Sequence, residues 1–257
     1  MTAKIETRLY VEDDLHESAT IGLDHGRAHF LRSVLRLGQG ARVALFNGRD
    51  GEWQARIDGL GKGWASLQVE HQRRPQTDSP DVWLAFAPIK RARLDFLIEK
   101  AVELGVARLR PVMTEHTAVS RVNRDRLAAN AREAAEQCER LDLPAVDEPI
   151  RLFDLFDGWR SDRRLLLCAE AGPSRPIAEV LAEAAERRGG NPISDWALLT
   201  GPEGGFSHGE LDALRKLPFV TAVGLGPRVL RADTAALAAL ACWQAWLGDG
   251  GHTPPRA

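Results

Sequence analysis

Residues 198–211 read LLTGPEGGFSHGEL, and this stretch joins an apolar strand to a helix through a turn rich in glycine. The apolar run 196–200 has the length of a buried strand, and a Gly-Pro pair ends it. Ser207, followed three residues later by Glu210, is a capping box that opens a helix. A strand, a glycine turn and a helix N-terminus can hold a small ligand, because glycines let backbone groups approach it. An ordinary tight turn explains the same residues, so this stretch alone leaves both interpretations open.

The stretch VGLGPRVLRADTAALAAL, at residues 223–240, repeats this arrangement near the end of the chain. A strand ends at a Gly-Leu-Gly-Pro turn and a long helix follows, so the two turns can line one pocket. A dinucleotide fingerprint needs a third glycine where this chain has Val229, and neither turn has the Gly-Lys-Ser/Thr of a phosphate-binding loop. The pattern therefore disfavours a dinucleotide or a nucleoside triphosphate as the ligand.

Strand-like and helix-like patterns alternate through the last two thirds of the chain. The expected strands cover residues 81–89, 107–114, 163–171, 196–200 and 221–226. The expected helices cover 94–106 with Gly105 as its cap, 124–141, 177–188, a segment that starts after Ser207, and 232–247. Repeated βα units of this kind predict an α/β domain in which helices cover both faces of a parallel sheet.

The first 74 residues have a different pattern, in which turns separate short apolar runs. Asn-Gly and Asp-Gly pairs interrupt the stretch 41–57, and another apolar run follows at 63–70. This spacing predicts a β module rich in hairpins. We divide the chain into this module (1–74), a polar linker (75–80), the α/β domain (81–248) and a disordered tail (249–257).

The composition is typical of a soluble globular protein, with 257 residues of which 44% are hydrophobic and 27% are charged. The N-terminus lacks an apolar leader and no apolar stretch is long enough to cross a bilayer, so we expect a cytoplasmic protein. The cysteines Cys138, Cys168 and Cys242 are odd in number and far apart, which favours reduced thiols. His25 and His29 lie four residues apart without a third ligand nearby, so we expect no metal site.

The charge distribution is more informative than the net charge of −2, because nucleic-acid-binding proteins need a basic face rather than a basic total. The stretch from Arg27 to Arg56 holds six arginines and only two acidic residues. This local positive charge fits an RNA-binding surface and a solvated surface equally well.

The segments GPEGGFS (201–207) and LGPRVLRADTAAL (225–237) together resemble the two signature segments of the ribosomal RNA small-subunit methyltransferase E family, in the SPOUT class of knotted methyltransferases. The resemblance covers most of the chain. The further segments that match, in the family's order, are RLY (8–10), HFLRSVLRLGQG (29–40), KRARLDFLIEKAVELGV (90–106) and EAAEQCERLDLPAV (133–146). This ordered agreement favours a ligand-binding role for both glycine turns.

Two positions depart from the family pattern. Asp233 stands where the family usually has glutamate, which keeps the charge and shortens the side chain. Glu139 stands where a glycine is common after the preceding helix, so we expect that helix to continue further toward Pro144.

The resemblance implies an N-terminal PUA-like β-barrel that helps to bind RNA and a C-terminal α/β domain with a deep trefoil knot. Knots are nearly absent from proteins, so βα alternation alone does not predict one. The resemblance also implies transfer of a methyl group from S-adenosylmethionine to N3 of a uridine in 16S ribosomal RNA, with the small ribosomal subunit as partner. Family members are homodimers with each cofactor pocket near the subunit interface.

The implied cofactor site combines glycines, for access, with apolar residues, for contact. Its members are Leu199, Thr200, Gly201, Pro202, Gly204, Leu225, Gly226 and Leu230. Uridine N3 must lose a proton before it attacks, and a fixed cation stabilises the resulting negative charge. We expect Arg231 and Arg228 to supply this cation and Glu203 to orient a partner or accept a proton. The arginines can instead pair with Glu203 or Asp233, and no general base is evident.

The predicted RNA contacts are basic residues of both domains: Arg8, Arg32, Arg36, Lys90, Arg91 and Arg93. Two other functions remain open. One is a SPOUT methyltransferase that acts on transfer RNA or on another RNA position. The other is an RNA-binding protein that has lost catalysis.

Overall fold

The computed structural model describes residues 4–188 and 195–252. The chain forms two compact units. The first consists of the residues up to Asp78 together with Ala135–Leu143, and the second consists of Ser79–Ala134 together with the residues from Pro144 onward. The first unit thus includes Ala135–Leu143, a segment that is far in sequence from the other residues of that unit.

The first unit is built on a five-stranded sheet in the order β1-β3-β4-β5-β2. The strands are β1 (Arg8–Tyr10), β2 (Thr20–Leu23), β3 (Arg42–Phe46), β4 (Glu52–Leu60) and β5 (Ala65–Arg74). Only β1 and β3 pair in parallel, and every other pair is antiparallel. Alternate side chains of these strands form one apolar core, which includes Val43, Ile57 and Leu67. The predicted β module is confirmed.

A short helix, α1 (His25–His29), continues into a π-helical turn (Phe30–Val34) in this unit. Asp24 caps the start of α1 by accepting a hydrogen bond from the Arg27 backbone N–H. Neither this helix nor strands β1 and β2 follow from the sequence pattern, because each is only three to five residues long.

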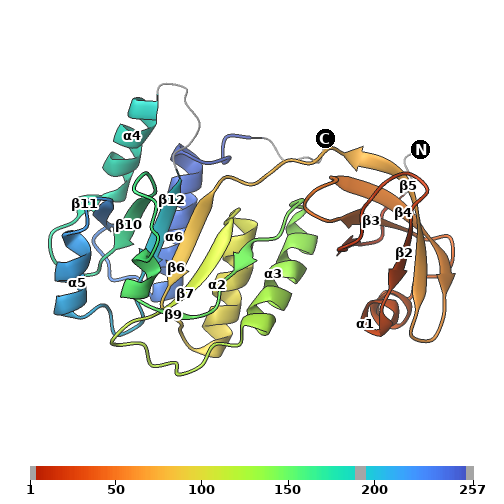
Figure 1. Cartoon of the computed structure of the whole chain (residues 1–257), viewed down its shortest axis with the longest axis horizontal. Helices are drawn as coiled ribbons and strands as arrows, with labels where there is room; N and C mark the ends of the chain where they lie inside the picture. The colour runs from red at the N-terminus through yellow and green to blue at the C-terminus, as the bar shows by residue number, and fades with distance from the viewer. Residues whose placement is uncertain (1–3, 189–194, 253–257) are drawn as a thin grey trace. The chain divides into compact units, whose positions relative to one another are not determined.

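The second unit contains a parallel sheet in the order β11-β13-β10-β12-β6-β7-β8, and β9 also pairs with β7. Figure 1 labels β10, β12, β6 and β7 within this sheet. The longer strands are β6 (Val82–Phe86), β7 (Arg108–Met113), β10 (Arg164–Cys168), β12 (Trp196–Thr200) and β13 (Val220–Gly224). The short ones are β8 (Ala145–Val146), β9 (Ile150–Arg151) and β11 (Arg175–Pro176). Each pair of neighbouring strands runs in parallel.

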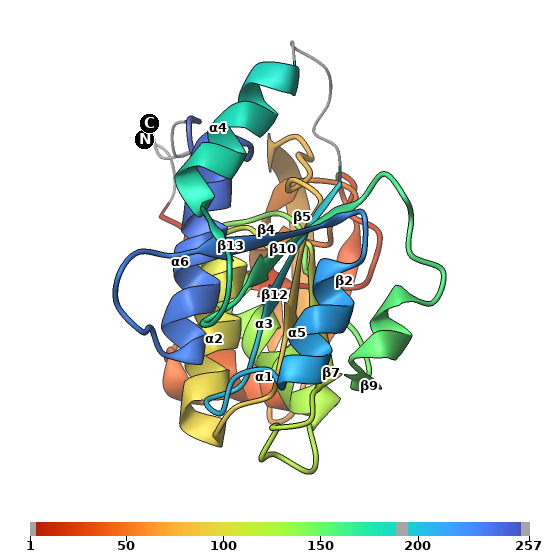
Figure 2. The ribbon, with the colours of Figure 1, turned by 90° about the vertical axis from the view of Figure 1, so that its left-hand side faces the viewer.

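Helices cover both faces of this sheet, as predicted. The helices are α2 (Arg91–Glu103), α3 (Arg124–Cys138), α4 (Ile177–Arg188), α5 (His208–Arg215) and α6 (Ala232–Trp246). Figure 2 shows α2, α4 and α6 on one side of the sheet and α5 on the other. Phe206, Leu211 and Leu214 pack from the α5 side onto the sheet, together with a 3-10 turn at Phe153–Phe156.

The order of the strands brings the ends of three of them together. β13 lies between β10 and β11, although β10 and β11 follow one another in the sequence. Cys168 pairs with Val223 on one side of β13, and Arg175 pairs with Val223 on the other. The connection 169–174 therefore crosses β13 at its carboxyl end. The two glycine turns follow β12 and β13 at the same edge of the sheet.

Two local expectations are wrong. Helix α3 ends at Cys138 and does not continue to residue 141, because Glu139 adopts a left-handed conformation with φ of 65°. At the chain end, residues 249–252 form a turn bonded to Gln244, whose Oε1 and backbone carbonyl accept hydrogen bonds from the N–H groups of Asp249 and Gly250. The rest of the expected tail, 253–257, lies outside the described residues. By contrast, Gly105 has φ of 75° just after α2 and is the cap that was predicted.

Candidate functional site

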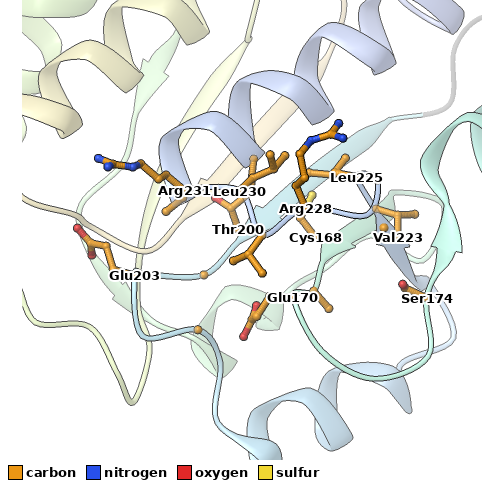
Figure 3. A pocket seen from close by; sticks show the side chains of 18 of the residues that line it. Cys168, Glu170, Ser174, Thr200, Glu203, Val223, Leu225, Arg228, Leu230 and Arg231 are labelled. Carbon is orange, nitrogen blue, oxygen red and sulfur yellow. The ribbon is translucent and has the colours of Figure 1, made fainter.

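A cavity of about 450 Å³ opens at the carboxyl ends of β10, β12 and β13 (Figure 3). Three chain segments line it, within 168–174, 200–205 and 223–235. Ligands of parallel α/β sheets bind at this edge of the sheet, and the volume is that of a site for a small molecule. The two glycine turns singled out in the sequence therefore border one cavity.

Most of the residues predicted to hold a ligand line this cavity. They are Thr200, Gly201, Pro202, Leu225, Gly226 and Leu230. Leu199 does not line it, because its side chain points into the apolar core and is fully buried. Gly204 lies against His116 instead, and its neighbour Gly205 is the glycine that faces the cavity.

The third lining segment was not predicted. It contributes Cys168, Ala169, Glu170, Gly172 and Ser174, which follow β10. A signal was present, because an apolar strand is followed here by another Gly-Pro pair. Only the pairing of β13 with both β10 and β11 brings this segment to the cavity. Burial raises the pKa of the Cys168 thiol to about 12, so this cysteine is not a nucleophile at neutral pH.

The first glycine turn has a defined shape. The Gly205 N–H donates to the Pro202 carbonyl at 3.0 Å, and Gly205 has φ of 69°, which favours glycine. The Phe206 N–H donates to Oε1 of Glu170 at 3.1 Å, so the segment after β10 contacts the turn directly. A Cβ atom at Gly205 would overlap the Glu170 carboxylate.

The helix after this turn starts with the predicted capping box. Ser207 Oγ accepts from the Glu210 N–H at 3.2 Å, and Glu210 Oε2 accepts from the Ser207 N–H at 2.9 Å. The other oxygen of Glu210 accepts from the Glu115 N–H at 2.8 Å. Glu210 is buried, and these bonds fix the start of α5 to the loop that follows β7.

The second glycine turn carries the two arginines predicted to act in catalysis. Gly226 has φ of 101°, and Arg231 is the N-cap residue of α6. Arg228, Arg231 and Glu203 all line the cavity and are exposed. Figure 3 shows Arg231 and Glu203 on the same side of the cavity, whereas Arg228 extends in the opposite direction. Within the described residues, neither arginine forms an ion pair, so their positive charges stay available to a ligand.

Basic residues also surround the start of α2, at the same edge of the sheet. Lys90 and Arg91 are exposed, and Arg93 Nη1 lies 3.9 Å from Oδ1 of Asp233. This pair joins the first turn of α2 to the first turn of α6. Asp233, which departs from the family pattern, thus pairs with Arg93 and not with Arg231.

The predicted RNA contact at Arg8 conflicts with the structure, because Arg8 is only 8% exposed. Its Nε donates to Oε2 of Glu52 at 2.7 Å, and its guanidinium also donates to the backbone carbonyls of Ala135, Glu136 and Arg140. Burial lowers the pKa of Arg8, although Glu52 opposes that shift. Arg8 therefore holds the end of α3 within the first unit, and we leave it out of the RNA surface.

The other two basic candidates of the first unit are exposed. Arg32 lies in the π-helical turn, and Arg36 has φ of 55° just after it. Phe30 and Val34 of the same turn are 37% and 60% exposed. Exposed apolar and cationic side chains thus alternate here, a combination suited to RNA bases and phosphates. π-helical turns occur frequently at functional sites.

Metal-binding and membrane-spanning features are both absent from residues 4–188 and 195–252. In these ranges no group of three His, Cys, Asp or Glu side chains is arranged to hold a metal ion. No helix in the same ranges has both the length and the apolar character to cross a membrane.

Comparison with known proteins identifies relatives over nearly the whole chain. Residues 77–244 match the family model of an RNA methyltransferase domain, and residues 23–70 match that of an RNA methyltransferase PUA domain. Ribosomal RNA small subunit methyltransferase E of Rickettsia conorii is 33% identical over 237 residues, which cover 91% of this chain and 93% of that protein.

Two solved structures have the same fold. The first, ribosomal RNA small subunit methyltransferase E of Neisseria gonorrhoeae bound to S-adenosylmethionine, has a TM-score of 0.81 at 27% identity and covers 95% of this chain and 99% of its own. A protein of Legionella pneumophila, in complex with bound S-adenosylmethionine, has a TM-score of 0.80 at 28% identity. That match covers 96% of this chain and all of the other chain.

Proposed function

Because the chain belongs to the ribosomal RNA small subunit methyltransferase E family, we propose that it methylates N3 of a uridine in 16S ribosomal RNA with S-adenosylmethionine. The observation that carries the proposal is the cavity between two glycine turns, bordered by the unpaired cations Arg228 and Arg231. The proposed substrate is the small ribosomal subunit, so the proposed place of action is the cytoplasm.

The cavity fits the cofactor in size and in chemistry. Its volume of about 450 Å³ suits a molecule of this size, and its walls combine apolar side chains with glycine backbone. Pro202, Leu225 and Leu230 would contact the apolar surface of the adenine, and backbone groups near Gly201 and Gly226 would bind its polar edge. When bound, S-adenosylmethionine supplies a methyl group that its sulfonium already activates. The protein must then align the acceptor with that methyl group and exclude water.

The acceptor requires a cation, because uridine N3 becomes nucleophilic only after it loses its proton. Negative charge then spreads onto the adjacent carbonyl oxygens of the base. Arg231 is exposed at the cavity and has no ion-pair partner among the described residues, so it can stabilise this charge. We assign Arg228 a supporting role, and Glu203, beside Arg231, orients a partner or accepts the proton.

Basic residues of both units contact the RNA in this proposal. Lys90, Arg91 and Arg93 bind phosphates near the cavity, and Arg32 and Arg36 bind RNA through the first unit. The target base must leave its stack to reach the cavity. We propose the assembled small subunit as substrate rather than free RNA, because the chain is not strongly basic overall, with a net charge of −2.

We also propose that the active form is a homodimer and that the chain is knotted. Helix α6 presents apolar or small side chains to solvent at Ala241, Ala245 and Trp246, and Trp246 is 48% exposed. An exposed apolar helix face of this kind supports a subunit interface.

The position of β13 between β10 and β11 supports a trefoil knot, because residues 169–174 then cross the path of the chain.

The proposed reaction is tested in a strain that lacks the gene. Small-subunit ribosomal RNA and transfer RNA are digested to nucleosides, and 3-methyluridine is counted by mass spectrometry. We expect 3-methyluridine to disappear from the ribosomal RNA and to return with the wild-type gene. With Arg231→Ala we expect a methylation rate roughly 10²–10³ times lower, because a donor to the developing charge is lost.

Arg187→Ala is the matched control for this experiment. Arg187 is an exposed arginine on α4 that pairs with Glu183 and lies outside the cavity lining, so this variant should restore methylation fully. An unchanged level of 3-methyluridine in the deletion strain would overturn the assignment to uridine N3. Loss of a methylated nucleoside from transfer RNA would redirect the proposal to that substrate.

A further inference from the structure

Two side chains that the proposed reaction does not use hold the backbone of the first glycine turn. They are His116, from the loop after β7, and Glu170, from the segment after β10. Neither the sequence pattern nor the proposed mechanism assigns them a role. Both contact the backbone of residues 204–206, which lies between the cofactor cavity and the start of α5.

His116 binds two carbonyl groups of the turn. Its Nδ1 lies 3.1 Å from the Gly204 oxygen and 3.2 Å from the Gly205 oxygen. Carbonyl oxygens only accept hydrogen bonds, so Nδ1 must carry the hydrogen and donate it to this pair. A Cβ atom at Gly204 would lie 3.2 Å from Cβ of His116, so the side chain packs closely against a position that glycine fits.

The loop that carries His116 is itself held in place. The Thr117 N–H donates to the Thr114 carbonyl at 3.1 Å, and the Thr114 N–H donates to Thr117 Oγ1 at 2.9 Å. The Glu115 N–H donates to Glu210, the buried residue of the capping box. His116 therefore projects from a closed turn that is bonded to α5.

Glu170 contacts the same turn at Gly205 and Phe206. Its Oε1 accepts the Phe206 N–H at 3.1 Å, and its side chain leaves no room for a Cβ atom at Gly205. The segment that carries Glu170 is tied to α5 as well, because Arg215 donates to the Ala171 carbonyl. Two segments far apart in the sequence thus bind three consecutive residues of the turn.

We propose that His116 and Glu170 are positioning residues that shape the 202–206 turn before the cofactor binds. This inference rests on the proposed function for the identity of the ligand. The two side chains bind backbone groups of residues 204–206. Pro202, Glu203 and Gly205 of the same turn line the cavity, as does Glu170 itself, whereas His116 lies outside the lining. A turn that is already ordered binds its ligand without the entropic cost of ordering it.

The proposal predicts how cofactor affinity changes when each bond is removed. We expect His116→Ala and Glu170→Ala each to raise the Kd for S-adenosylmethionine about tenfold, measured by isothermal titration calorimetry. Both side chains hold one turn, so the double variant should lose less affinity than the product of the two single effects. His116→Asn and Glu170→Gln keep a donor and an acceptor, respectively, and should recover most of the affinity.

Hydrogen exchange measured by mass spectrometry on the cofactor-free protein gives a readout that catalysis does not affect. We expect the amides of 203–207 to be protected in the wild type before any cofactor is added, and to exchange faster in both alanine variants. His208→Ala and Glu186→Ala are the matched controls. Both of these residues are exposed and lie outside the cavity lining, so their variants should match the wild type in affinity and exchange.

The outcomes separate this inference from the proposed function. A wild-type protein that does not bind S-adenosylmethionine overturns the proposed function. A wild type that binds, with alanine variants of unchanged affinity or with no recovery by Asn and Gln, overturns the positioning role. If an alanine variant does not fold, hydrogen exchange of the wild type still tests the positioning role. Amides of the turn that become protected in the wild type only after the cofactor is added would overturn that role.

Discussion

At the scale of single residues, Glu52 is the centre of a buried charge cluster in the first unit. It is 2% exposed, and its carboxylate accepts from Arg8 at 2.7 Å, from Arg74 at 2.7 Å and from Arg73 at 2.5 Å. Burial alone would raise the pKa of Glu52, but hydrogen bonds and charges from Arg74 and Arg8 outweigh burial and lower it. The ionised carboxylate is therefore part of the folded state.

We predict that Glu52→Gln destabilises the protein by about 3–5 kcal/mol, because it leaves buried arginine charge without a counter-charge. Chemical denaturation followed by circular dichroism measures this change. Glu17→Gln, at an exposed position, is the control and should stay within about 0.5 kcal/mol of the wild type. Equal stability of the two variants would contradict this prediction and would mean that the arginines find other partners.

The same substitution should change how stability depends on pH. The pKa of Glu52 is lowered in the folded state, so its contribution is complete above the unfolded value of about 4.5 and is lost as the pH falls through the lower folded value. The wild type should therefore lose stability below about pH 4.5 more steeply than Glu52→Gln.

At the scale of elements, the end of α3 depends on one strained residue. Glu139 has φ of 65° directly after the helix, where the left-handed region costs a residue with a side chain about 1–2 kcal/mol. The last carbonyls of α3 are bound by Arg8, and Arg74 donates to the Glu139 carbonyl at 3.0 Å. Contacts within the first unit thus stop the helix at Cys138 even though glycine is absent.

We predict that Glu139→Gly raises the free energy of unfolding by about 0.5–1 kcal/mol. The free energy gained by relieving the left-handed strain exceeds the entropic cost that arises because glycine makes the unfolded chain more flexible. Glu133→Gly makes the same chemical change at an exposed position inside α3, where it should lower stability by about 1 kcal/mol. Thermal unfolding of both variants measures whether stability rises in Glu139→Gly and falls in Glu133→Gly. A loss of stability in both variants would contradict the strain argument.

At the scale of the whole molecule, the exposed apolar side chains divide between the two units. Trp64 of the first unit is 54% exposed, and Trp246 at the end of α6 in the second unit is 48% exposed. Trp246 lies on a long helix whose neighbouring exposed positions, Ala241 and Ala245, are also small and apolar, whereas Trp64 lies on no helix. This continuity is why we assign the proposed homodimer contact to α6.

We predict that Trp246→Glu converts the dimer to monomers, because it places a charge in an apolar interface. Size-exclusion chromatography with light scattering measures the mass, and circular dichroism should show unchanged folding. Trp64→Glu is the control and should remain dimeric. A wild type that is already monomeric would contradict the proposed homodimer.

Several features follow from the sequence by itself because they depend on neighbouring residues. A continuous apolar run placed β12 at 196–200, and the Ser207 and Glu210 pair placed the start of α5. The glycines of both turns marked where a chain leaves a strand and bends. The two-part organisation, with a β module followed by an α/β domain, also follows from such local patterns.

Only the tertiary structure decided which of these elements meet. Insertion of β13 between β10 and β11 brings Glu170 to the cavity, and the loop after β7 brings His116 to the glycine turn. Burial likewise separates Arg8, bound to Glu52, from Arg231, exposed at the cavity. Strand order and burial depend on contacts between residues far apart in the chain, and local periodicity carries no information about those contacts.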